Sequence, residues 1–168
     1  PENTKDIMYP NKMGKIKNLA MIPFHHIFGF VAVFLWYTYY GKTLVYPASL
    51  ATNDILGICQ KCDVTHVYSV PLLWDSLAKN VQRQISMMEK EYQEMFDHLV
   101  KVNTKEVDEE LSLKEKVMMK KLQGKLIGKK VRYAISGGGY LSEETSRLIN
   151  GLGYPLYNGY GMTEAGVV

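Results

Sequence analysis

The sequence has little that would indicate a secreted, membrane-spanning or nucleic-acid-binding protein. Its longest apolar run, residues 27–40, is shorter than the roughly 18–20 residues that cross a bilayer and predicts a buried helix instead. The polar residues 1–17 contain no signal peptide. A formal net charge of +3 is too small to indicate a nucleic-acid partner. The composition, 46% hydrophobic and 22% charged, is that of an ordinary globular domain.

Cysteine is also scarce, since the chain has only Cys59 and Cys62, which form a C-x-x-C pair. Such a pair occurs in redox sites and as half of a zinc site. A thioredoxin-type pair lies at the start of a helix, which lowers the thiol pKa, whereas this pair ends a predicted helix. The sequence has no second C-x-x-C and no spaced histidine pair. We therefore expect structural thiols in a reducing compartment, and hence a cytoplasmic protein.

Short apolar segments alternate with helical segments along the chain. Apolar and β-branched stretches predict strands at residues 18–23, 42–46, 64–70, 131–136 and 155–158. Helices are predicted at 27–40, from Thr52 or Asn53 to Lys61, from Pro71, and from a cap at Ser142. This alternation is typical of an α/β fold, here a mainly parallel sheet with flanking helices.

The charge-rich residues 84–128 interrupt the alternation. Met88, Tyr92, Met95 and Leu99 repeat with helical spacing, and charges fill most positions between them. A polar break at 103–110 precedes a second helical segment. We expect an inserted helical hairpin that lies outside the sheet and is separable from the α/β core.

Basic residues are concentrated in residues 113–132, where Glu115 is the only acid. A solvated helix face accounts for this pattern. The alternative is a peripheral contact of 113–132 with an anionic membrane surface, which would make the protein membrane-associated. The basic residues are Lys114, Lys116, Lys120, Lys121, Lys125, Lys129, Lys130 and Arg132.

Three segments follow predicted strand ends, namely residues 24–26, 137–140 and 159–164. Ligands of parallel sheets bind beyond the carboxyl ends of the strands, so we expect these segments to line one edge. The glycine run 137–139 is not a dinucleotide fingerprint, because Ser142 stands where that pattern needs glycine. It either lets the backbone approach a flat ligand or forms a simple tight turn. His25 and His26 are adjacent, so on a regular element they would point apart, which argues against paired zinc ligation.

Residues 157–164 (YNGYGMTE) are the most informative segment. They combine an aromatic ring, a hydroxyl and a carboxylate on a backbone with two glycines. A ring can cover a base, a hydroxyl can meet a phosphate oxygen, and a carboxylate suits Mg²⁺. The segment therefore indicates either a nucleotide site or an ordinary strand–turn–helix junction.

These residues resemble motifs of the AMP-forming acyl-CoA synthetases, which belong to the adenylate-forming superfamily. Residues 158–164 (NGYGMTE) are similar to the family's Y-G-x-T-E adenylate motif. Residues 136–142 (SGGGYLS) resemble its S-G-G-A-P-L-S adenine loop, with Gly139 in place of Ala and Tyr140 in place of Pro. Residues 23–29 (PFHHIFG) resemble P-L-F-H-x-x-G, which makes His26 the matching histidine. The charged insertion is similar to that of the long-chain fatty-acid branch.

The resemblance implies a role for each matching residue. Tyr160 would stack on adenine, Thr163 would contact a phosphate oxygen and Glu164 would hold Mg²⁺. His26 would lie near the acyl carboxylate, so the catalytic residues would be His26, Thr163 and Glu164. The nucleotide-binding residues would be Gly137, Gly138, Gly139, Tyr140, Asn158, Gly159, Tyr160, Gly161, Met162 and Thr163.

The resemblance also implies the reaction, in which a carboxylate and ATP give an acyl-adenylate and pyrophosphate before transfer to CoA. Residues 1–168 would then be part of a larger AMP-binding domain, with residues 84–128 as an insertion. The phosphate loop would precede Pro1, and the C-terminal domain with its lysine would follow Val168. We expect the isolated fragment to be inactive. The alternatives are a non-catalytic remnant that binds a nucleotide or a partner, and an adenylation domain that loads an acyl carrier protein.

Overall fold

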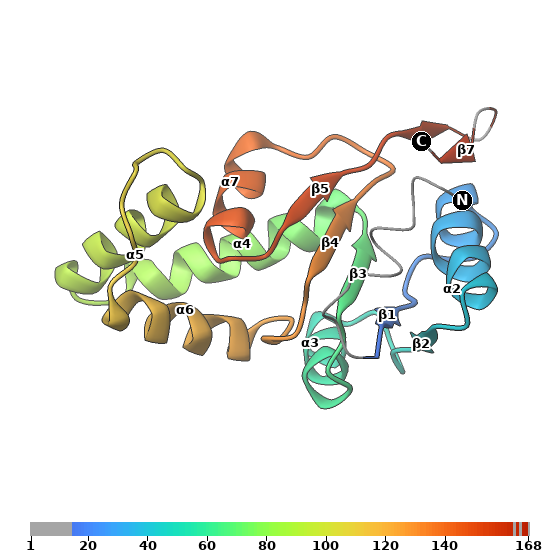
Figure 1. Cartoon of the computed structure of the whole chain (residues 1–168), viewed down its shortest axis with the longest axis horizontal. Helices are drawn as coiled ribbons and strands as arrows, with labels where there is room; N and C mark the ends of the chain where they lie inside the picture. Colours follow the sequence, from blue (N-terminus) through green and yellow to red (C-terminus); the bar gives the residue numbers. More distant parts are fainter. Residues whose placement is uncertain (1–14, 163, 165, 168) are drawn as a thin grey trace.

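A parallel sheet lies at the centre of the chain (Figure 1). The computed structural model describes residues 15–162, 164, 166 and 167. The strands are β1 (Lys17–Leu19), β2 (Thr43–Val45), β3 (His66–Ser69), β4 (Tyr133–Ser136) and β5 (Leu156–Asn158). They are ordered β2-β1-β3-β4-β5, and each neighbouring pair is parallel. The α/β fold with a parallel sheet is thus confirmed, although the strands are shorter than predicted.

Helices cover both faces of this sheet. Side chains alternate between the two faces of a strand, so Leu19 and Val67 enter one core while Ala20 and Tyr68 enter another. The larger core contains residues of α3 (Thr52–Lys61), α4 (Pro71–Ser86) and α7 (Glu143–Gly151). The smaller core contains residues of η2 (Phe28–Leu35) and α2 (Trp36–Tyr39).

The apolar run 27–40 differs from the single buried helix that was predicted. Residues 28–35 are wound as a π-helix, and the Trp36 N–H donates to Val31 O, five residues back. Only one side is buried, since Phe30 and Leu35 are exposed. No helix in the described part of the chain is both long and apolar enough to cross a membrane.

The charged insertion forms α5 (Lys90–Asn103) and α6 (Leu113–Lys125), which lie to one side of the sheet (Figure 1). α4 runs through Gln84 to Ser86, so the helix that crosses the sheet continues into the insertion. α6 begins at a capping box, in which the Glu115 N–H donates to Ser112 Oγ and the Ser112 N–H donates to Glu115 Oε2.

This hairpin shares its core with the sheet. Leu99, Val100 and Leu122 pack into the same cluster as Ala134 and Ile149. Side-chain amides reinforce the contact, because Asn103 Nδ2 donates to Gly151 O at 2.6 Å and Gln123 Nε2 donates to Leu152 O at 2.8 Å. The hairpin lies outside the sheet, as expected, but its apolar side belongs to the main core.

A small antiparallel pair follows β5 and was not predicted. It consists of β6 (Gly161–Met162) and β7 (Gly166–Val167). Figure 1 shows β7 beside the helical segment that begins at Phe28. The end of the described chain therefore returns to the region that follows β1.

Candidate functional site

A cleft of about 450 Å³ opens at the carboxyl edge of the sheet. Segments that are far apart in the sequence meet there because parallel strands end at the same edge. The histidines after β1, the glycine turn after β4 and residues 159–161 after β5 all contribute. The lining residues are Ile22, Pro23, His25, His26, Ile27, Phe28, Val70, Gly137, Gly138, Gly159, Tyr160 and Gly161.

The turn after β4 needs glycine at two positions for different reasons. A Cβ on Gly137 would lie 2.9 Å from the ring of Phe28, which covers the backbone there. Gly138 has a φ of 77°, in the left-handed region that favours glycine. The Gly137 N–H donates to Ser69 O at 3.0 Å and ties the turn to the end of β3. Phe28 fills the space beside Gly137, so a flat ligand can approach the backbone closely at Gly138.

His25 and His26 lie on a tight turn between β1 and η2. The His26 N–H donates to Pro23 O at 3.2 Å, and His26 O accepts from the Phe30 N–H at 2.8 Å. Gly29 is required here, because a Cβ would overlap the carbonyl oxygen of Pro23. The two exposed rings lie with centroids 4.2 Å apart and line the same cleft. The rings do not point apart, as they would on a regular element, because this segment is a turn.

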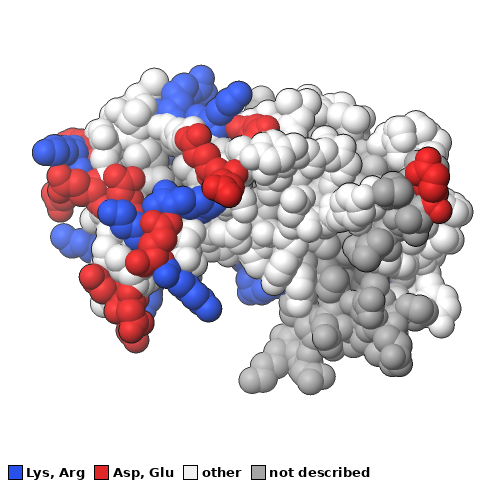
Figure 2. Space-filling model, turned by 90° about the horizontal axis from the view of Figure 1, so that it is seen from above, with Lys and Arg blue, Asp and Glu red and all other residues white. Residues whose placement is uncertain are grey.

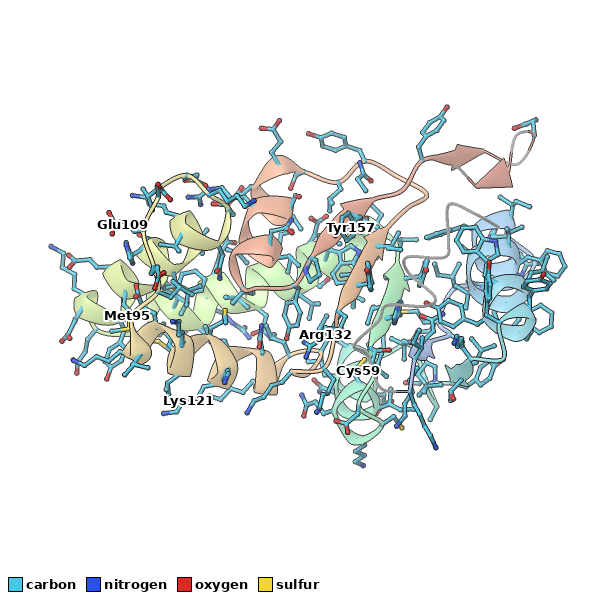
Figure 3. The ribbon with its side chains drawn as sticks, viewed as in Figure 1. Cys59, Met95, Glu109, Lys121, Arg132 and Tyr157 are labelled. Carbon is cyan, nitrogen blue, oxygen red and sulfur yellow. The ribbon has the colours of Figure 1, made fainter. Side chains whose placement is uncertain are left out.

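Tyr160 also lines the cleft. The Gly159 N–H donates to Ser136 O at 2.7 Å, which fixes the segment to the end of β4. The Tyr160 ring is 67% exposed and thus offers a free aromatic surface. Its neighbour Tyr157 instead points away from the ribbon of β5 (Figure 3) and stacks on Tyr133, with centroids 6.1 Å apart.

Several residues predicted for the site lie elsewhere. Tyr140 is 84% exposed and does not line the cleft. Gly139 faces the ring of Pro71, which a Cβ would meet at 3.5 Å. Glu164 is exposed in the turn between β6 and β7. Met162 contributes backbone to β6, and Thr163 lies outside the described residues.

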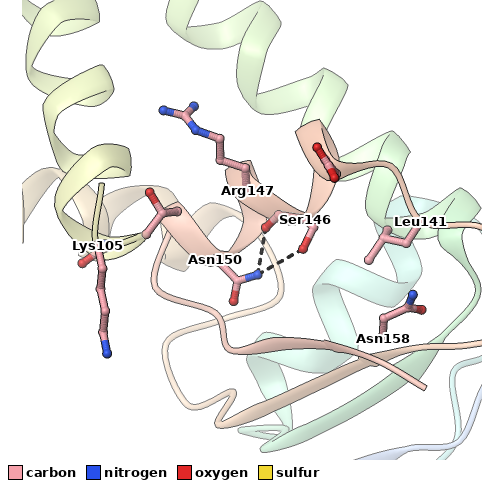
Figure 4. A pocket seen from close by; sticks show the side chains of 9 residues that line it. Lys105, Leu141, Ser146, Arg147, Asn150 and Asn158 are labelled. Carbon is pink, nitrogen blue, oxygen red and sulfur yellow. Dashed lines mark hydrogen bonds between the residues drawn. The ribbon is translucent and has the colours of Figure 1, made fainter. Parts of the chain in front are cut away.

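Asn158 lines a second, polar cavity of about 560 Å³ on the α7 side of β5 (Figure 4). Asn150 is held there by its Nδ2, which donates to Ser146 O at 2.9 Å. The guanidinium of Arg147 donates twice to Glu106 and holds the pKa of that carboxyl down to about 2, with help from Thr104. The cavity is lined by Asn103, Thr104, Lys105, Leu141, Glu143, Ser146, Arg147, Asn150 and Asn158.

Sequence reasoning missed Val70 and Phe28 as lining residues. Val70 directly follows β3 and could have been found by the strand-end argument that identified the other segments. Phe28 had no comparable signal, because its position depends on how η2 packs over Gly137.

The chemistry of the cleft is limited by its side chains. Its lining, as far as the structure describes it, contains no Asp, Glu, Lys or Arg. The described residues hold no cluster of three or more His, Cys, Asp or Glu suited to a metal ion. Both cysteines are free thiols, and burial, followed by the charge of Cys62, raises the pKa of Cys59 to about 12. A thiol of that pKa is a poor nucleophile, which fits a structural role.

Comparison with known proteins identifies relatives of the chain. The sequence profile of the family described as "AMP-binding enzyme" matches residues 5–168. A long-chain-fatty-acid–CoA ligase 2 from Schizosaccharomyces pombe is 25% identical over 154 residues, which cover 87% of this chain and 22% of the ligase. The chain thus spans about a fifth of that relative.

Solved structures show the same fold. The adenylation domain of a carboxylate reductase from Mycobacterium chelonae has a TM-score of 0.61 and 20% identity, over 95% of this chain and 22% of that one. A carboxylic acid reductase domain from Segniliparus rugosus, in complex with AMP and a co-purified carboxylic acid, has a TM-score of 0.57 and 18% identity. That match covers 99% of this chain and 25% of the other.

Proposed function

This chain belongs to the AMP-binding enzyme family, and on that premise we propose that it is part of an ATP-dependent fatty-acyl-CoA synthetase. The observation that carries the proposal is the cleft that gathers His26, Gly138 and Tyr160 at one edge of the sheet. A relative named as a long-chain-fatty-acid–CoA ligase supports the fatty acid and CoA as substrates. A structural neighbour that holds AMP and a carboxylic acid supports a site for both.

Two features of the cleft fit an adenine base. The exposed side chain of Tyr160 supplies an aromatic surface. The backbone at Gly138, which is open apart from Val70, supplies a surface that a flat base can approach. Asn158, which the resemblance also assigns to the nucleotide, lines the cavity beside α7 and not this cleft.

His26 is the residue of the described cleft that we assign to the acyl carboxylate. Its ring can donate a hydrogen bond to a carboxylate oxygen, and the turn from Pro23 fixes its backbone. The apolar side chains of Ile22, Phe28 and Val70 line the same cleft. They suit the hydrocarbon part of a fatty acid better than a charged group.

Magnesium fits this site only as an ion shared with the nucleotide. Mg²⁺ is usually held by one or two carboxylates together with substrate phosphates, and not by a protein cage. The resemblance assigns one carboxylate to Glu164, which lies in the turn between β6 and β7 outside the described cleft lining, and a phosphate contact to Thr163. Bound there, the ion would offset phosphate charge during the attack of the carboxylate.

In the proposed reaction, a carboxylate oxygen bonds to the α-phosphorus of ATP as the bond to the bridging oxygen of pyrophosphate breaks. The CoA thiol, after loss of its proton, then attacks the acyl carbon and AMP leaves. An acyl carrier protein is the alternative acceptor. The parent protein would act in the cytoplasm, which the free thiols of Cys59 and Cys62 support.

The 168-residue chain alone should not complete this reaction. The described cleft lining offers no Lys or Arg for the phosphates, and positioning of reactants supplies roughly 7–11 kcal/mol of barrier reduction. We expect weak ATP binding at best and no release of pyrophosphate.

Pyrophosphate release from ATP and a fatty acid tests the proposal. The assay compares the 168-residue chain, the parent protein, and the parent with Glu164→Gln, which removes the anionic ligand for Mg²⁺. We expect activity only in the parent and a loss of about 100-fold in the variant. Glu110→Gln, which makes the same change at an exposed glutamate of the hairpin, serves as the control and should leave the rate unchanged.

Two results would contradict this function. Turnover by the isolated chain would show that it contains all essential groups, and full activity of Glu164→Gln would remove this glutamate from the site. A parent protein that binds ATP but never releases pyrophosphate would support the non-catalytic alternative.

A further inference from the structure

We propose that the helical hairpin binds the surface of an anionic lipid bilayer through a groove between α5 and α6. The groove has a volume of about 910 Å³ and lies on the hairpin, apart from the cleft. Four methionines, Met87, Met88, Met95 and Met118, line it together with Leu122. Figure 3 shows Met95 between the two helices. Methionine side chains are flexible and apolar, so such a surface adapts to an irregular partner like lipid.

The rim of the groove carries large apolar side chains that the fold leaves uncovered. Leu113 is 82% exposed and Met87 is 79% exposed, and Val117 and Tyr92 are exposed beside them. Single exposed apolar residues are ordinary, whereas a group around one groove marks an interaction site. Their projection beyond the helices suits insertion between lipid headgroups.

Positive charge accompanies the apolar groove, because α6 carries exposed lysines. All five of its lysines are exposed, and Figure 3 shows Lys121 projecting from the helix. Its only acid, Glu115, is turned inward, where Oε1 lies 2.5 Å from His98 Nδ1 and Oε2 accepts from Ser112. The exposed charged side chains of α6 are therefore all lysines. The lysines are Lys114, Lys116, Lys120, Lys121 and Lys125.

The distribution of these lysines favours a bilayer over a partner helix. Lys114, Lys121 and Lys125 line the groove, while Lys116 and Lys120 lie elsewhere on the exposed surface of α6. A partner helix would have to present acids and apolar residues in register with the groove, whereas an anionic bilayer offers diffuse negative charge to the three groove lysines and an apolar interior to the exposed rim. Glu89, the N-cap residue of α5, and Glu91, in its first turn, also line the groove and would limit how far that side approaches the headgroups.

Vesicle sedimentation with the full 168-residue chain tests the proposal. The probes are phosphatidylcholine vesicles with and without phosphatidylserine. Binding should require phosphatidylserine. The triple variant Lys114→Gln, Lys121→Gln, Lys125→Gln should bind about 100-fold more weakly, since each lysine near an anionic surface contributes about 1 kcal/mol. The matched control changes three exposed lysines outside the groove, Lys61→Gln, Lys79→Gln and Lys101→Gln, and should bind more tightly than the groove variant.

The insertion of apolar side chains into the bilayer is tested separately from the contribution of charge. Leu113→Gln should weaken vesicle binding without changing the net charge, and the emission of Leu113→Trp should shift to the blue on vesicles that contain phosphatidylserine. Circular dichroism of each variant checks that the fold is retained. Equal losses in both triple variants would overturn the proposal, because net charge alone would then explain binding. A chain that forms a dimer which Leu113→Gln dissolves would also overturn it, with a second copy as the occupant. No arm uses ATP, so the outcome is independent of the proposed function.

Discussion

The cleft and the helical hairpin present different kinds of surface, one formed largely by backbone and the other by side chains. Four of the residues that line the cleft are glycines, and their positions follow from backbone contacts such as Gly137 N–H to Ser69 O. The hairpin packs on the core through apolar side chains, and charged side chains pair over its surface, among them His98 with Glu115 and Arg147 with Glu106. Figure 2 shows the same division, with charges crowded over the hairpin and few over the rest of that face.

This difference determines how each region can recognise a ligand. At the cleft, glycines leave the backbone accessible to a ligand, so specificity must come from shape and a few polar groups. At the hairpin, side chains provide the surface, so charge and exposed apolar area determine what binds. The two regions nevertheless share one core, because Leu99 and Ala134 belong to the same cluster.

The largest expected effect tests whether this shared core makes the two regions one folding unit. Leu99 is fully buried at the contact of the hairpin with the sheet. Leu99→Ala should lower the free energy of unfolding by about 3–4 kcal/mol through lost apolar contacts and a cavity. Leu72→Ala, at a position on α4 that is 73% exposed, makes the same change and should alter stability by less than about 0.5 kcal/mol.

Urea unfolding followed by circular dichroism and by tryptophan fluorescence measures this effect. Trp36 and Trp74 lie in elements that pack on the sheet, so fluorescence reports on that region. We expect one transition with both probes. Two separate transitions, with only the helical signal affected by Leu99→Ala, would show that the hairpin is a separable insertion.

The next effect concerns the backbone of the cleft. Gly29→Ala would place a methyl group against the carbonyl oxygens of Pro23 and Ile22, which cannot move without shifting the histidine turn. The variant should lose about 2–3 kcal/mol of stability. Gly57→Ala, in α3 with open space around it, should instead be neutral or gain up to about 1 kcal/mol. Thermal unfolding of both variants checks the contrast, and equal stability of the two would show that the turn is not sterically fixed.

The sequence predicted which segments meet at the edge of the sheet better than it predicted where individual residues lie at that edge. Alternating strands and helices were sufficient to place His26, Gly138 and Tyr160 at one edge, because that result depends only on the parallel topology. The position of Tyr140 depends on the left-handed turn at Gly138, and Gly139 meets Pro71 through the packing of α4. Such local geometry is not contained in a strand pattern.

The hairpin shows the same limit. Its two helices followed from helical spacing and from the capping residues Ser112 and Glu115. Their attachment to the core did not, because Val100 packs on Gly151, which lies more than fifty residues later in the sequence. The burial of Glu115 against His98 is also a tertiary result, and it turns a mixed-charge helix into one with a cationic surface.

The smallest expected effect is a pH dependence of folding stability that arises from His98 in the hairpin. His98 lies between two carboxylates, with Nδ1 2.5 Å from Glu115 and Nε2 2.9 Å from Glu109, and these contacts raise its pKa above the usual 6.5. Burial alone would raise the pKa of Glu115, but hydrogen bonds from Ser112 and His98 outweigh it and lower that pKa. The raised histidine pKa stabilises the folded state below about pH 6.5, and this contribution is lost as pH rises through the folded-state value.

Proton NMR titration of the His98 ring measures the shift directly. Glu115→Gln and Glu109→Gln should each lower the pKa of His98, with the larger change for Glu115 because its hydrogen bond is the stronger cause. Glu110→Gln alters the neighbouring glutamate and should leave the His98 pKa unchanged. In urea, wild type should lose stability as pH rises from 6 to above the His98 pKa, and His98→Gln should lose less over that range. Identical pH profiles for wild type and His98→Gln would mean that the charged network of the hairpin does not contribute to its stability, and the contrast with the backbone-built cleft would then be one of surface charge alone.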